Sequence, residues 1–226
     1  MERVVLARRR RPGEADSVAR PPDRRQALQL VAGALGVTAL GIGTCRGVEG
    51  CRRRLGPEYE DETASWRRAI EALAGDGMWL VARGYHIGDD IIAIATNSPL
   101  SHACVLDLGR QEVIEALGHG VVATPLGEFL RHSHRLLVIR PNGWTREKGA
   151  EALARARGKV GSGYDFLGIV GAPSKTRFYC SELALWSMGF PVDRKGPHRI
   201  FHPRHLDERG EVLFDSRSRD AAPDFG

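Results

Sequence analysis

The stretch "HACVLDLGRQEVIEAL" (102–117) decides the fold, because it has the pattern of two β-strands joined by a tight turn. Residues 102–108 and 112–117 are the two strand-like runs, and a glycine lies in the turn between them. If the turn has two or four residues, Cys104 faces Glu115 across the hairpin. A turn of odd length would move the glutamate to the other face of the sheet, so the turn decides which side chains meet.

With the even-length turn, His102 and Glu115 lie on the same face of the sheet as diagonal neighbours, about 7–8 Å apart at Cα. A single glutamate in an otherwise apolar strand needs a hydrogen-bonding partner or water, and His102 is placed to be that partner. The alternatives are a structural histidine and an ordinary ion pair. The opposite face of the hairpin is apolar and carries Ala103, Val105, Ile114 and Ala116.

Outside the hairpin, the residue patterns predict an α+β fold in which an antiparallel sheet packs against helices. Strands are expected mainly in the first half of the chain and helices in the second. Two segments, 83–90 and 117–124, have the pattern of loops that would wall a pocket. The further strands expected are 78–83, 135–140 and 211–216, and the helices expected are 63–74, 89–96, 124–131, 145–159 and 181–188.

A second stretch, "RFYCSELALW" (177–186), puts Cys180 at the start of a predicted helix. A free cysteine is usually a small buried apolar group, and that is the alternative here. A helix N-terminus carries partial positive charge and free N–H groups, which favour a thiolate and can hold an oxyanion. A nucleophilic thiol also needs a base and a group that orients the base, and His102 and Glu115 are the candidates.

Four short motifs occur in order along the chain. They are Gly75-Asp76 before the first strand, Ser101-His102 at a strand start, Glu115 in the following strand, and Tyr179 to Glu182 at a helix start. Together they resemble the circularly permuted papain-like proteins of the NlpC superfamily, the YaeF/YiiX-like group, which are distant relatives of lecithin retinol acyltransferase. The resemblance extends over about 75–216, and the histidine precedes the cysteine, as the permutation requires.

The resemblance implies a permuted papain-like fold and a thiol enzyme, with Cys180 as nucleophile, His102 as base and Glu115 as the orienting third member. Tyr179 is a candidate for lining the oxyanion site, although an aromatic residue before a helix more often serves packing. Cys104 lies on the same face as His102, which leaves open which thiol a reagent would modify. Structural roles are expected for Glu182 at the helix start and for Tyr164-Asp165 in a loop.

The N-terminal segment, 1–45, has the pattern of an export signal. Arg24-Arg25 resembles a twin-arginine signal, an uncharged apolar run follows over 27–44, and Cys45 stands where bacterial lipoproteins are acylated. The alternative is an uncleaved membrane anchor, because the run is close to the shortest length that spans a bilayer. The 23 residues before the arginine pair favour a start codon further downstream.

The rest of the chain is expected to divide into a linker at 46–62, a papain-like domain at 63–216 and a tail at 217–226. The formal net charge is +5, but residues 1–45 hold eight arginines and four acidic residues, so the remainder is close to neutral. This distribution gives no support for binding to nucleic acid. The fourth cysteine, Cys51, lies in the charged linker and has no expected role.

Two clusters of histidines raise the question of a metal site. Pro203 interrupts the helix that would align one cluster, and no carboxylate stands at a ligand-like spacing. Neither a metal ion nor another cofactor is therefore expected. The clusters are His198, His202 and His205 in one segment, and His132 and His134 in another.

These features predict a hydrolase of the amidase or peptidase type, exported to the periplasm or cell envelope and tethered to the membrane by its N-terminus. Its substrate would be a peptide, peptidoglycan or lipid-linked amide or ester, cleaved through an acyl-enzyme on cysteine. One alternative is an acyltransferase of the lecithin retinol acyltransferase type, which a closed apolar groove would favour. The other is a non-catalytic envelope lipoprotein, which would have no need of an intact thiol, imidazole and carboxylate. The oligomeric state is left open.

Overall fold

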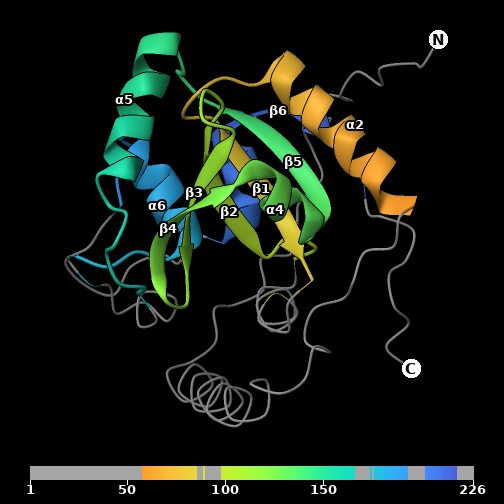
Figure 1. Cartoon of the computed structure of the whole chain (residues 1–226). Helices are drawn as coiled ribbons and strands as arrows, with labels where there is room; N and C mark the ends of the chain where they lie inside the picture. The colour runs from red at the N-terminus through yellow and green to blue at the C-terminus, as the bar shows by residue number, and fades with distance from the viewer. Residues whose placement is uncertain are drawn as a thin grey trace, which may run out of the picture. The chain divides into compact units, whose positions relative to one another are not determined.

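Six strands form one antiparallel sheet in the part of the chain that the structure describes, residues 58–85, 89, 98–165, 174, 176–192 and 202–217 (Figure 1). The structure is a computed structural model. The strands lie in the order β4-β3-β2-β1-β5-β6, and neighbours are antiparallel throughout. Their bounds are β1 Trp79–Gly84, β2 His102–Asp107, β3 Glu112–Leu117, β4 Gly120–Pro125, β5 Ser133–Pro141 and β6 Gly210–Asp215.

The β2–β3 hairpin has the register predicted from its sequence. Cys104 faces Glu115, and Asp107 faces Glu112. The turn between the strands has four residues, 108–111, and Gln111 adopts a left-handed backbone with a φ of 53°. Because this turn has an even number of residues, it leaves Glu115 on the same face of the sheet as the first residue of β2.

The Gly-Asp motif before β1 secures this hairpin. Asp76 accepts hydrogen bonds through Oδ1 from the N–H of Leu108 at 2.7 Å and from the N–H of Gly109 at 3.3 Å. Gly77 follows with a φ of 77°, and a Cβ at this position would lie 2.2 Å from the carbonyl oxygen of Gly149. The motif therefore has a structural role, because Asp76 holds the hairpin turn, and the following Gly77 allows α5 to approach the start of β1 closely.

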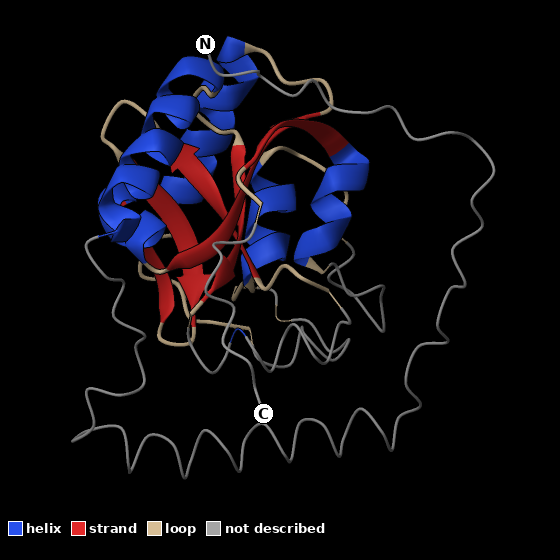
Figure 2. Ribbon diagram, turned by 90° about the vertical axis from the view of Figure 1, so that its right-hand side faces the viewer, coloured by secondary structure: helices blue, strands red, loops and turns tan. Residues whose placement is uncertain are grey.

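Helices cover both faces of the sheet (Figure 2). On one face, Ala103 and Ile114 pack with Leu183 of α6 and with residues of α5. On the other face, Cys104 and Val113 pack with residues of α2 and α4. The chain thus has two apolar layers, as the alternation in the hairpin predicts. The helices are α2 Glu58–Leu73, α4 Leu126–Arg131, α5 Arg146–Arg157 and α6 Cys180–Ser187.

Three features differ from the expectations drawn from sequence. The helix α2 begins at Glu58 and not at Thr63, so the predicted linker is too long; the acidic first turn suits a helix N-terminus but shows no apolar periodicity. The predicted loop at 117–124 contains β4, a short strand whose place depends on its pairing with β3. A 3-10 helix, η3 (Pro203–Arg209), precedes β6 where no element was expected.

Several predictions lie outside the described residues. They concern the export signal with Cys45, the position of Cys51, and the helix at 89–96 apart from Asp89. All described residues belong to one compact unit, Cys45–Gly226. Within the described ranges, no helix combines the length and the apolar character that crossing a membrane requires.

Candidate active site

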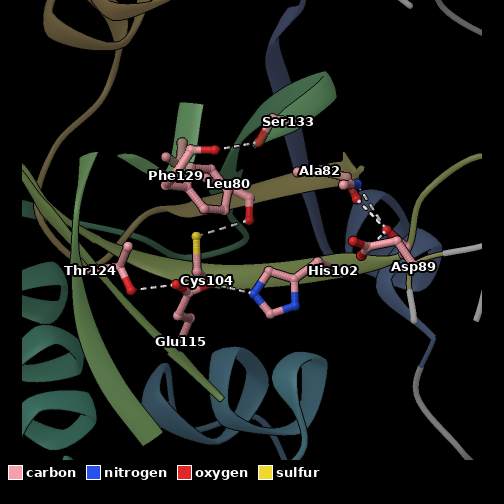
Figure 3. Close-up of polar contacts among 11 residues, drawn as sticks. Leu80, Ala82, Asp89, His102, Cys104, Glu115, Thr124, Phe129 and Ser133 are labelled. Carbon is pink, nitrogen blue, oxygen red and sulfur yellow. Dashed lines mark hydrogen bonds and ion pairs between the residues drawn. The ribbon is translucent and has the colours of Figure 1, made fainter. Parts of the chain in front are cut away.

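His102 and Glu115 form a close pair on the sheet, and Figure 3 shows both side chains. His102 is the first residue of β2, and Nε2 of its imidazole lies 2.6 Å from Oε2 of Glu115. The imidazole is 14% exposed and the glutamate side chain 6%. A carboxylate buried to this extent needs a strong partner, and the histidine is that partner, as the hairpin register predicts.

The second oxygen of the same carboxylate is also engaged. The hydroxyl of Thr124, on β4, donates a hydrogen bond to Oε1 of Glu115 at 2.5 Å. Figure 3 shows Glu115 lying between Thr124 and His102. Both carboxylate oxygens therefore accept hydrogen bonds, which is the pattern expected for an ionised glutamate.

The protonation of this pair follows from its surroundings. Burial alone would raise the pKa of Glu115, but the hydrogen bond and charge of His102, the hydroxyl of Thr124 and the charge of His119 lower it below 4.5. Burial alone would lower the pKa of His102, yet hydrogen bonds and charge from Cys180 and Glu115 raise it well above 6.5. The site therefore favours an imidazolium next to a carboxylate at neutral pH.

Cys180 is the first residue of α6 and is only 5% exposed. The helix packs against β2 and β3, and Cys180 is one of the groups that raise the pKa of His102. Because Nε2 of the imidazole faces Glu115, Nδ1 is the ring nitrogen left for the thiol. The imidazole thus interacts with a carboxylate at 2.6 Å and electrostatically with the thiol at a helix N-terminus, a set of groups suited to nucleophilic catalysis.

Cys104 belongs to a different environment. It is fully buried in the apolar layer next to α2 and α4, and its thiol donates to the carbonyl oxygen of Leu80 at 3.5 Å. Burial, followed by the charges of Glu115 and Cys180, raises the pKa of the Cys104 thiol well above 9.0. Cys104 is therefore held as a protonated thiol in this structure.

Tyr179 and Glu182 organise the start of α6. The carboxylate of Glu182 accepts a hydrogen bond from the backbone N–H of Tyr179 at 3.4 Å, and it is fully buried. The side chain of Tyr179 is 3% exposed and packs in the apolar layer below α6. The expected structural role of Glu182 is confirmed, and packing accounts for Tyr179 in this structure.

Tyr164 is linked to the segment that leads into Cys180. Its backbone forms a parallel bridge with Phe178, two residues before Cys180. Burial, and then the electrostatic interaction with Cys180, raises the pKa of the Tyr164 hydroxyl well above 10.0. The neighbouring Asp165 accepts a hydrogen bond from the backbone N–H of Ser174 at 2.6 Å. Asp165 thus has the expected structural role, while Tyr164 contributes to the surroundings of the thiol.

A second pair, Ser101 and Asp89, fixes the segment that leads into His102. The hydroxyl of Ser101 donates to Oδ1 of Asp89 at 2.6 Å and accepts from the N–H of Gly84 at 3.1 Å. A Cβ on Gly84 would lie 2.1 Å from Oδ2 of Asp89, so this arrangement depends on a glycine. The Ser-His motif therefore anchors the backbone as well as supplying the imidazole.

A cavity of about 380 Å³ reaches the His102–Glu115 pair from the side of β4 and α4. Both segments predicted to wall a pocket, 83–90 and 117–124, contribute to its lining. The lining includes several ionisable or polar groups besides the pair, namely Asp89, His119, Thr124, Glu128 and His132. Cys180 is not among the described residues that line this cavity.

The remaining histidine clusters have other partners in the described parts of the chain. Nδ1 of His134 lies 3.3 Å from the hydroxyl of Tyr85, and Nδ1 of His205 accepts from the backbone N–H of His202 at 3.2 Å. Of the first cluster, His198 lies outside the described residues. No group of three or more His, Cys, Asp or Glu side chains in the described residues is arranged to hold a metal ion.

The antiparallel sheet, the helix that begins with a thiol and the order of histidine before cysteine define a permuted papain-like domain. Residues 86–191 match the model of the family described as "Permuted papain-like amidase enzyme, YaeF/YiiX, C92 family". The resemblance read from the four sequence motifs is thereby confirmed.

Two relatives illustrate the similarity. "Probable lipoprotein peptidase YaeF" of Escherichia coli K12 is 34% identical over 79 residues, which are 35% of this chain and 28% of that protein. The crystal structure of "metalloprotein yiiX" from Escherichia coli O157:H7 is 27% identical, with a TM-score of 0.43, over 50% of this chain and 63% of that chain. The matches thus cover less than two thirds of the length of either relative.

Proposed function

We propose that this protein is a cysteine hydrolase that cleaves an amide or ester bond through an acyl-enzyme on Cys180. The observation that carries the proposal is the pairing of His102 with the carboxylate of Glu115 at 2.6 Å, together with the electrostatic interaction of the same imidazole with Cys180 at the start of α6. The family of residues 86–191 is described as an amidase family, and that description agrees with the proposed chemistry.

The proposed reaction has two halves. The Cys180 thiolate attacks the carbonyl carbon, and the first N–H groups of α6 stabilise the oxyanion. The His102 imidazolium then donates its proton to the leaving amine or alcohol, which breaks the scissile bond and leaves a thioester. In the second half His102 takes a proton from water, the hydroxide attacks the thioester, and the acid and the thiolate are released. Throughout, Glu115 orients the imidazole and stabilises its charged form.

The proposed substrates are peptide, peptidoglycan or lipid-linked amides and esters. We further propose that the protein is exported to the cell envelope and is tethered there through its N-terminal segment, with Cys45 as the lipidation site. The sequence of residues 24–45 supports this location, and so does the description of the relative YaeF as a probable lipoprotein peptidase.

A reaction with p-nitrophenyl acetate tests the acyl-enzyme directly. The full-length protein is expected to release a burst of p-nitrophenolate and to carry an acetyl group on the peptide that contains Cys180, detected by mass spectrometry. Cys180→Ala should lose both signals, and His102→Ala should slow the burst by about 100-fold or more. Acetylation that is equally fast in Cys180→Ala would contradict the proposal.

The same experiment separates the alternatives. Adding a primary amine or an alcohol as an acceptor distinguishes water from another acyl acceptor, because only an acyltransferase would pass most of the acetyl group to the acceptor. A folded wild-type protein that forms no acyl-enzyme would instead favour a binding lipoprotein. Circular dichroism of each variant confirms that loss of the burst does not result from unfolding.

A further inference from the structure

The carboxylate of Glu115 contacts His102 through one oxygen and Thr124 through the other. The proposed catalysis accounts for the contact with His102 but not for the contact with Thr124. Oε2 faces Nε2 of His102 at 2.6 Å, and Oε1 accepts the hydroxyl of Thr124 at 2.5 Å (Figure 3). Glu115 is 4% exposed. A carboxylate with a single hydrogen bond can still rotate about its terminal torsion, which is broad. A second hydrogen bond to the other oxygen removes that freedom.

The sheet places the hydroxyl at this oxygen. In the pairing of β3 with β4, Thr124 faces Val113 and Glu115 faces Val122, so Thr124 and Glu115 are diagonal neighbours on one face. Thr124 is held by the ladder immediately before α4 and is β-branched, so its χ1 angle has few alternatives. The hydroxyl is therefore held in place by β4 and donates its hydrogen bond to a side chain of the neighbouring strand β3.

We propose that Thr124 is a positioning residue that fixes the Glu115 carboxylate in the orientation facing His102. The inference rests on the proposed function of His102 and Cys180, but it concerns a residue that neither the sequence motifs nor the catalytic proposal uses. Thr124 acts through Glu115 and has no assigned contact with the thiol. A valine would fill almost the same volume, so the proposal concerns the hydroxyl and not the shape of the side chain.

The charged groups around His102 and Glu115 determine what removal of the Thr124 hydroxyl should do. His102 on β2 and His119 in the β3–β4 turn both act on Glu115, and Cys180 on α6 acts on His102. Removing the hydroxyl leaves these charges in place but releases the carboxylate to rotate. The contact between Glu115 and the imidazolium should then weaken, and His102 should lose its proton at a lower pH than in the wild type.

The test compares Thr124→Val with Thr124→Ser, which keeps the hydroxyl. The His102 imidazole is titrated by NMR, and the rate of Cys180 alkylation by iodoacetamide is measured at pH 7. Thr124→Val should lower the pH of the His102 transition and slow alkylation by about 3–10-fold, the effect of one lost hydrogen bond. Thr124→Ser should stay within about twofold of the wild type. Thr124→Ala serves as a second variant without the hydroxyl if the valine variant does not fold.

A matched control is Thr145→Val, the same chemical change at the N-cap of α5, where the hydroxyl accepts from the N–H of Lys148. It should leave both measurements unchanged. An unchanged or higher His102 transition in a folded Thr124→Val or Thr124→Ala protein would overturn the inference, as would a serine variant that behaves like the valine variant. If wild-type Cys180 proves unreactive, the catalytic proposal fails, whereas the His102 titration still decides the role of Thr124.

Discussion

At the scale of single residues, the site depends on the buried ion pair of His102 and Glu115. Burial disfavours the charged forms of both His102 and Glu115, yet each group stabilises the charged form of the other. Removing one partner of such a pair destabilises the folded protein, because it leaves an uncompensated polar group in the interior. The pair should therefore be visible in the pH dependence of stability as well as in activity.

Glu115→Gln tests this electrostatic pairing. The folded-state pKa of His102 is raised above 6.5, so its contribution to stability is complete below that pH and is lost as the pH rises through the folded-state pKa. The pKa of Glu115 is lowered below 4.5, so its contribution is present above that value and is lost in acid. Between the two limits, Glu115→Gln should reduce the free energy of unfolding by about 2 kcal/mol.

Urea unfolding of wild type and Glu115→Gln at about pH 5.5 and about pH 9 measures this effect. The difference between the two proteins should be larger at the lower pH, where His102 is charged. A difference that is independent of pH, or that grows towards pH 9, would show that the carboxylate does not stabilise an imidazolium.

The sequence predicts this pair because it depends only on the parity of one turn. His102 and Glu115 lie on strands joined by four residues, so local pattern is sufficient to bring them to one face. Thr124 and Tyr164 could not be found in this way. Thr124 depends on the pairing of a strand that has the pattern of a loop, and Tyr164 depends on a bridge to a segment 14 residues further along the chain.

At the scale of elements, Asp76 supports the turn of the hairpin that carries the pair. Its carboxylate accepts two backbone hydrogen bonds from the turn. Asp76→Ala should reduce the free energy of unfolding by about 1–3 kcal/mol, because two turn N–H groups lose their acceptor. The amides of Leu108 and Gly109 should also exchange faster with solvent than in the wild type.

Asp76→Asn is the matched variant, since its amide oxygen can still accept from the turn. It should keep more of the stability than the alanine variant. If Asp76→Ala unfolds at the same urea concentration as the wild type and shows unchanged exchange at Leu108, the motif does not stabilise the hairpin. Its presence would then need another explanation.

The elements themselves were predicted well where apolar periodicity is strong. The bounds of β3 are those predicted, and Thr145 caps α5 as expected. The start of α2 was wrong because acidic residues favour a helix N-terminus through charge and not through an apolar face. The strand β4 was missed because it is short and half-exposed, so it exists through its ladder with β3 and not through its own pattern.

At the scale of the whole molecule, the order of the chain explains how distant motifs form one site. His102 and Glu115 come from the sheet, whereas Cys180 comes from a helix that is encoded after the whole of α5. Sequence alone suggested this association only through a family resemblance, because nothing local in "FYCSEL" specifies the strand it meets. The packing of α6 on β2 supplies that information.

The proposed tether also belongs to this scale. When the full chain is produced in a Gram-negative host, Cys45 should incorporate labelled palmitate and the protein should fractionate with membranes. Cys45→Ser should lose the label. Label that persists in the variant, or that is absent from the wild type, would contradict lipidation at this cysteine. The acyl-enzyme proposal for Cys180 would be unaffected.

The most direct test of the central claim is the pH dependence of Cys180 alkylation by iodoacetamide in wild type and His102→Ala. Peptide mapping reports each thiol separately, so the buried Cys104 serves as an internal reference. In the wild type, Cys180 should react at pH 6 at a rate within about threefold of that at pH 8, whereas in His102→Ala the rate at pH 6 should fall by about tenfold or more. The same pH profile in both proteins, or an unreactive Cys180 in both, would contradict a thiolate–imidazolium pair and with it the proposed enzyme.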